Sequence, residues 1–128
     1  MRLRSLLFVP GDSDKKFARA ATTGADVLIL DLEDAVAPAL KDEARAKVAG
    51  WLDRAGEVPA ALFVRVNPLE SGLTEADLRA VVRPGLAGIL VPKANGAHDI
   101  ATIAAMIDPL EAASGMAVGS PPSTGTVK

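Results

Sequence analysis

One pattern occurs four times along this chain: a short apolar run, a turn with polar residues, and then a helical pattern. We expect the apolar runs to be strands, near residues 4–9, 26–32, 61–66 and 87–91. The helical patterns begin near residues 12–13, 38, 74 and 97. Strands that alternate with helices are typical of parallel sheets with right-handed crossover connections. Two architectures then fit, an open doubly wound sheet or part of a (β/α)8 barrel.

Polar and charged side chains at the ends of the second and third runs favour the barrel. Because strand residues alternate between the two faces of a sheet, Asp31 and Glu33 share one face. By the same count Arg65 and Asn67 share a face with Phe63. Barrel enzymes build their active sites at the carboxyl ends of the strands. We therefore expect Arg65 to lie within salt-bridge reach of at least one of these acids, although the pair could also be purely structural.

The fourth run ends in Pro92 and Lys93. Counting back in twos places Lys93 on the same face as Ile89 and Val91. We expect it to join the acids and Arg65, either in a site or as an ion-pair partner that fills the barrel.

Length and composition limit the remaining possibilities. A complete barrel needs about 250 residues, so 128 residues make about half of one. We expect residues 1–119 to be the N-terminal portion of a TIM-type (β/α)8 barrel, with about its first four or five βα units. Residues 120–128 are rich in turn formers and are expected to be an irregular or disordered tail.

Charge and cysteine content exclude several classes of function. The net charge is −2 and the basic residues are scattered, which argues against a nucleic-acid partner. The chain has no cysteine, so it has neither disulfides nor thiolate metal sites, and we expect a cytoplasmic protein. The first apolar run stops at Pro10 and is too short for an export signal. No segment has the ~18 apolar residues of a membrane span.

Two helical patterns carry further signals. On the long second helix Ala44, Val48, Trp51 and Leu52 form an apolar stripe, so Trp51 is expected in a core or interface rather than as a stacking platform. At the start of the third helix, the spacing of Thr74 and Asp77 predicts a capping box.

Four motifs occur in order along the chain, one at each expected strand. They are Arg4–Asp12, Gly24–Val36, Val64–Pro68 and Val91–Lys93. Together they resemble the first four strands of the citrate lyase β subunit family, the HpcH/HpaI-type aldolase superfamily that includes malyl-CoA lyases. The resemblance implies a Mg²⁺-dependent lyase that cleaves a carbon–carbon bond in a hydroxyacyl-CoA thioester of the citryl-CoA or malyl-CoA type. The products would be a 2-oxo acid and acetyl-CoA.

The same resemblance assigns roles to individual residues. It implies catalytic functions for a set that surrounds the substrate, namely Arg65, Glu33, Asp34 and Asp31. It implies substrate or CoA contacts for Phe8, Pro10, Gly11, Arg19, Arg65, Asn67 and Lys93. Ser13 stands where family members often carry arginine, so Lys15 or Lys16 would have to replace that phosphate contact. The family's Mg²⁺ ligands lie on the fifth and sixth strands, so they are expected beyond Lys128 and none is expected in this chain.

Alternative functions stay open. The full-length protein could be an aldolase acting on free 2-oxo acids, or the chain could be a non-catalytic half-barrel for ligand binding or assembly. As a truncated or incomplete lyase, this chain alone is expected to be inactive. Its partners would be a CoA ester or small 2-oxo acid and further copies of itself, in a homo-oligomer such as a trimer.

Overall fold

The computed structural model describes residues 5–92, 97–113 and 123–127. Within these residues five parallel strands form one sheet, in the order β1-β2-β3-β4-β5. The strands are β1 (Leu6–Pro10), β2 (Val27–Asp31), β3 (Ala61–Arg65), β4 (Leu86–Pro92) and β5 (Ser123–Val127). The four predicted strands are confirmed, in sequential and parallel order.

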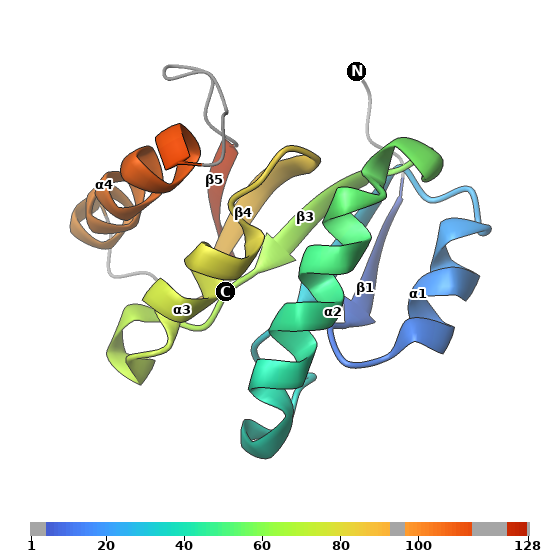
Figure 1. The fold of residues 1–128 in the computed structure, drawn as a ribbon, viewed down its shortest axis with the longest axis horizontal. Helices are drawn as coiled ribbons and strands as arrows, with labels where there is room; N and C mark the ends of the chain where they lie inside the picture. The colour runs from blue at the N-terminus through green and yellow to red at the C-terminus, as the bar shows by residue number, and fades with distance from the viewer. Residues whose placement is uncertain (1–4, 93–96, 114–122, 128) are drawn as a thin grey trace.

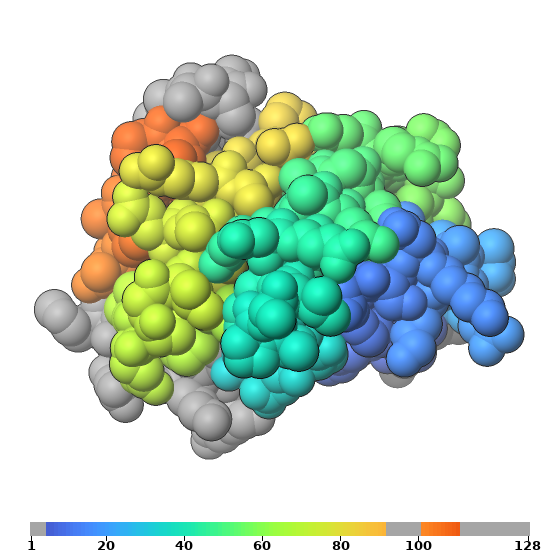
Figure 2. All heavy atoms as spheres, turned by 60° about the horizontal axis from the view of Figure 1, so that its bottom comes forward, coloured from blue at the N-terminus to red at the C-terminus, as the bar shows by residue number. Residues whose placement is uncertain are grey.

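The helices lie on one side of this sheet (Figure 1). They are α1 (Asp14–Ala21), α2 (Lys41–Asp53), α3 (Thr74–Val81) and α4 (Ala97–Ala113), with short 3₁₀ turns η1 (Pro38–Leu40), η2 (Ala55–Glu57) and η3 (Leu69–Ser71). Figure 2 shows α1, α2 and α3 side by side in chain order. An open doubly wound sheet would carry helices on both faces, so the one-sided layer confirms the barrel-type fold. None of the helices in the described ranges combines the length and apolar composition needed to cross a membrane.

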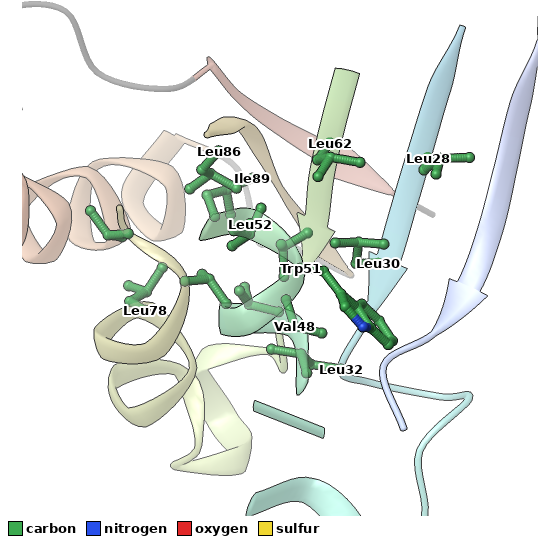
Figure 3. Close-up of a cluster of buried hydrophobic side chains, with 14 of the residues drawn as sticks. Leu28, Leu30, Leu32, Val48, Trp51, Leu52, Leu62, Leu78, Leu86 and Ile89 are labelled. Atoms are coloured by element: carbon green, nitrogen blue, oxygen red, sulfur yellow. The ribbon is translucent and has the colours of Figure 1, made fainter. Parts of the chain in front are cut away.

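The main core lies between the sheet and the helices (Figure 3). On β2 and β3, alternate residues Leu28, Leu30, Leu62 and Val64 are buried against the helical layer, as period-two strands require. Helix α2 contributes the predicted stripe, which consists of Ala44, Val48, Trp51 and Leu52. Trp51 is therefore a core residue, but it also stacks on Phe17 of α1, with ring centroids 4.4 Å apart.

The opposite face of the sheet carries the other alternate residues. Phe8, Ile29 and Phe63 are register partners across β1, β2 and β3. Two residues further along, Asp31 pairs with Arg65 in the same register. This face has no described helix over it, and in a closed barrel it points to the interior.

The face predicted for the end of β4 is wrong. Ile89 and Val91 belong to the core under the helices, not to the face of Asp31 and Arg65. Strand β4 is apolar on both sides, so its sequence offers no alternation from which a face could be read, and its register with β3 shifts by one residue after Leu62. Lys93 itself lies outside the described residues.

The expected irregular tail is also corrected. Residues 123–127 form β5, which pairs with β4 from Gly88↔Ser123 to Pro92↔Val127. The edge of β4 offers unpaired backbone groups, and Thr124, Thr126 and Val127 are β-branched residues that suit a strand. Turn-forming composition therefore does not prevent pairing where a sheet edge is available.

Candidate functional site

The site begins with an ion pair between the last residues of β2 and β3. Arg65 donates from Nε to Asp31 Oδ1 at 2.9 Å and from Nη2 to Asp31 Oδ2 at 2.6 Å. The same carboxylate also accepts from the backbone N–H groups of Glu33 at 2.8 Å and Ala35 at 3.0 Å. Parallel strands in register explain this geometry, because Asp31 and Arg65 are direct cross-strand partners.

Asp31 and Arg65 form a buried ion pair, and its hydrogen bonds shift the pKa values of both groups. Asp31 is 1% exposed and the Arg65 side chain 15%. Burial by itself would raise the pKa of Asp31, but the hydrogen bonds from Arg65, Glu33 and Ala35 outweigh it and lower the pKa below 3.8. The hydrogen bond to Asp31 raises the pKa of Arg65 in turn. Both groups are thus held in their charged forms.

Three other predicted residues surround Arg65 in different ways. Glu33 Oε1 lies 3.6 Å from Arg65 Nε. The guanidinium carbon of Arg65 lies 4.9 Å from the centroid of the Phe8 ring, a cation–π contact. Asp34 is exposed and acts on Arg65 only through its charge, as the last of the influences that raise the Arg65 pKa. The predicted convergence of Asp31, Glu33 and Arg65 is confirmed.

The Asn67 side chain does not lie in the predicted cluster with Arg65 but contacts Leu32 and Asp77. It is 3% exposed, and its Nδ2 donates to Asp77 Oδ2 at 2.7 Å and to the carbonyl of Leu32 at 3.0 Å. Its backbone N–H also donates to Asp77 Oδ2 at 2.7 Å. The predicted capping box is wrong: α3 has no side-chain cap, and Thr74 Oγ1 donates instead to the carbonyl of Asn67. Asp77 is fully buried because it stands on the same stripe of α3 as the core.

The residues assigned to a CoA contact are spread along β1 and α1. Gly11 is buried, and a Cβ there would lie 2.7 Å from the carbonyl oxygen of Asp31, so only glycine fits this close approach. Pro10 is the last residue of β1 and the register partner of Asp31. Ser13 caps α1 by accepting a hydrogen bond from the backbone N–H of Lys16. Arg19 is exposed in the last turn of α1, and no described contact joins it to the ion pair.

Two residues that support the site, one on each of two turns of α2, were missed from the sequence. Lys41 Nζ donates to the carbonyls of Leu32 and Glu33, at 2.8 and 3.0 Å. Arg45 Nε donates to Asp77 Oδ1 at 2.7 Å, which links α2 to α3. The available signal was a charged residue on an apolar helical stripe, as Asp77 is beside Leu78.

The described residues do not fit a metal ion by themselves. Among them no group of three or more acidic, histidine or cysteine side chains is placed to hold one. Each oxygen of Asp31 already accepts two hydrogen bonds. The geometry offers instead a fixed guanidinium beside an aromatic ring, which is suited to an anionic oxygen.

Sequence comparison places this geometry in a known family. Residues 4–122 match the profile of the HpcH/HpaI aldolase/citrate lyase family. The chain belongs to that family. It is 38% identical over 117 residues to the citrate lyase subunit beta of Haemophilus influenzae, a match that covers 91% of this chain and 40% of that relative. The chain thus spans less than half the length of this curated relative.

Solved structures of family members and more distant proteins agree with the fold. The malate synthase of Haloferax volcanii, in a ternary complex with pyruvate and acetyl-CoA, superposes with a TM-score of 0.82 at 21% identity, over 96% of this chain and 39% of that one. The citrate lyase beta subunit of M. tuberculosis, complexed with oxaloacetate and magnesium, gives a TM-score of 0.68 at 30% identity, over 95% of this chain and 56% of that one. The first of these likenesses concerns the fold alone.

Proposed function

We propose that this chain supplies the arginine part of the active site of a lyase that cleaves a hydroxyacyl-CoA thioester to a 2-oxo acid and acetyl-CoA. The observation that supports it most is Arg65, held by Asp31 at the carboxyl ends of β2 and β3. Family relatives named citrate lyase subunit beta and citramalyl-CoA lyase agree with this reaction class.

The chemistry needs a positive group at the bond that breaks. As the carbon–carbon bond cleaves, its electron pair passes to the thioester side and forms an enolate, while the hydroxyl proton leaves and the 2-oxo carbonyl forms. The enolate then takes up a proton to give acetyl-CoA. A guanidinium fixed in advance lowers the energy of such a developing charge without reorganisation. In this proposal Asp31 and Glu33 keep Arg65 charged and oriented, and Phe8 lines the approach to it.

The proposed enzyme depends on Mg²⁺, which is named in the structure of the M. tuberculosis relative. Since the described residues contain no metal cluster, the proposal places the ligands outside them. It also includes the homo-oligomer expected from the sequence. Light scattering coupled to size-exclusion chromatography measures that assembly.

The test compares thioester cleavage by the full-length protein and by its Arg65→Ala variant, with and without Mg²⁺, on citryl-CoA and malyl-CoA. We expect Arg65→Ala to cost about 2–4 kcal/mol of transition-state stabilisation, the loss of one oxyanion donor. Arg79→Ala is the control, because Arg79 is a surface residue whose ion-pair partner among the described residues is Glu75. Cleavage of free 2-oxo acids but not thioesters would favour the aldolase alternative, and binding without turnover would favour the non-catalytic module.

A further inference from the structure

The backbone between Asp31 and Glu33 is held from several sides. The N–H of Leu32 donates to the carbonyl of Arg65 at 3.0 Å. The carbonyl of Leu32 accepts from two side chains, Lys41 Nζ at 2.8 Å and Asn67 Nδ2 at 3.0 Å. This short segment leaves β2 and carries Glu33 towards Arg65, so its position decides where the Glu33 carboxylate lies.

Lys41 has an unusual place for a cation. It is the first residue of α2, where the helix dipole disfavours positive charge. In the described part of the chain no carboxylate forms an ion pair with it. Its ammonium group donates instead to the carbonyls of Leu32 and Glu33. Helix stability therefore does not explain why a lysine stands at position 41. Its hydrogen bonds to these two carbonyls do.

Asn67 is fixed in the orientation that this role requires. Asp77 is fully buried and accepts from both the backbone N–H and the Nδ2 of Asn67, each at 2.7 Å. Arg45 holds the other oxygen of Asp77 at 2.7 Å. With one Nδ2 hydrogen directed at Asp77, the other is available for the carbonyl of Leu32.

We propose that Lys41 and Asn67 are positioning residues, which fix the Leu32–Glu33 backbone and thereby set the Glu33 carboxylate beside Arg65. The catalytic part of this inference rests on the proposed lyase function; the mechanical part does not. Neither side chain needs to touch the substrate. Losing one of the two should let Glu33 move by a fraction of an ångström, and misplacement of about 1 Å in an active site can cost about 100-fold in rate.

The central variant is Lys41→Met, which keeps the aliphatic stem and removes the donors. Its matched control is Lys47→Met, because Lys47 also lies on α2 and pairs with Asp14, away from the ion pair of Arg65. Lys41→Arg, which retains a charged donor, is the conservative rescue. Asn67→Ala removes the donor to Leu32 without placing a second carboxylate beside Asp77, and it tests the second support independently, should Lys41→Met fail to fold.

Two measurements are made on the full-length protein. Hydrogen–deuterium exchange followed by mass spectrometry reports on the peptide that contains the Glu33 and Ala35 amides, both of which donate to Asp31. We expect Lys41→Met to speed their exchange at least about tenfold, with Lys47→Met unchanged and Lys41→Arg in between. We expect kcat for thioester cleavage to fall by about 10- to 100-fold while KM changes little.

The outcomes separate the two proposals. If the wild type itself cleaves no thioester but exchange is faster in Lys41→Met, the positioning of the Glu33 backbone is supported and the lyase function is overturned. An active protein whose exchange in this segment is the same in Lys41→Met and wild type would overturn the positioning. So would a loss of kcat in Lys47→Met as large as that in Lys41→Met, because the effect would then belong to α2 as a whole.

Discussion

Replacing Asp31 with asparagine should destabilise the protein far more than the same change at a surface aspartate. The substitution keeps the shape but removes the charge that faces Arg65, and it brings an amide N–H₂ against groups that already donate. Removing one partner of a buried pair costs about 3–5 kcal/mol. We expect a value near the lower end, about 3 kcal/mol, because the Arg65 side chain keeps 15% exposure and Glu33 lies 3.6 Å from it.

Asp53→Asn is the matched control. Asp53 also accepts from an arginine at both oxygens, Arg83 Nη1 at 3.0 and 2.8 Å, but its side chain is 58% exposed. Exposed pairs contribute about 0–1 kcal/mol. The assay is urea denaturation followed by circular dichroism for the wild type and both variants. Equal losses in Asp31→Asn and Asp53→Asn would refute the argument that burial gives the first pair its effect.

The pH dependence of this loss follows from the lowered pKa of Asp31. An unfolded chain protonates this carboxylate near pH 3.8, before the folded protein does. The stability that Asp31 contributes is therefore fully present above that pH and is lost as the pH falls through the lower pKa of the folded state. Asp31→Asn lacks this contribution, so the gap between wild type and variant should be constant near neutrality and should narrow below pH 3.8.

Two further predictions concern packing. Gly11→Ala should destabilise the protein by about 1–3 kcal/mol, because the added Cβ meets a backbone oxygen. Gly50→Ala should stabilise it by about 0.5–1 kcal/mol, because Gly50 lies in α2 and a Cβ there has no neighbour within 4 Å. Thermal melts that show the same change for both variants would contradict the close approach at Gly11. Trp51→Phe should cost about 1 kcal/mol through the lost Nε1 hydrogen bond to Asp14. Circular dichroism is the probe, since Trp51 is the sole tryptophan, and an unchanged midpoint would show that this bond contributes nothing.

The sequence sufficed for the first four strands and for the acid–arginine pair, and the reason is local. In β2 and β3 the apolar residues come first and the charges last, so period-two alternation fixes the face of Asp31 and Arg65 together. Parallel pairing then requires both strand ends to meet at one edge. No long-range information beyond the strand order was needed.

The sequence failed where local patterns are ambiguous or where a distant partner decides. Strand β4 is apolar on both sides, so the face of Ile89 could not be read. The spacing of Thr74 and Asp77 fits a capping box, but a buried Asp77 gains more from Arg45 and Asn67. Partners 32 positions apart, such as Arg45 and Asp77, are brought together only by the packing of α2 on α3.

The two buried aspartate–arginine pairs in the described residues connect different elements of the fold, and this difference bears on function. The pair of Arg45 and Asp77 joins two helices that no backbone hydrogen bonds connect. The pair of Arg65 and Asp31 joins strands that the β2–β3 ladder already holds in register. A buried ion pair is seldom more stable than apolar residues of the same size, so the fold has little need of charge at this second position. Chemistry that uses a fixed guanidinium at the mouth of a barrel gives a reason for it, and this is why the proposed function is built on Arg65.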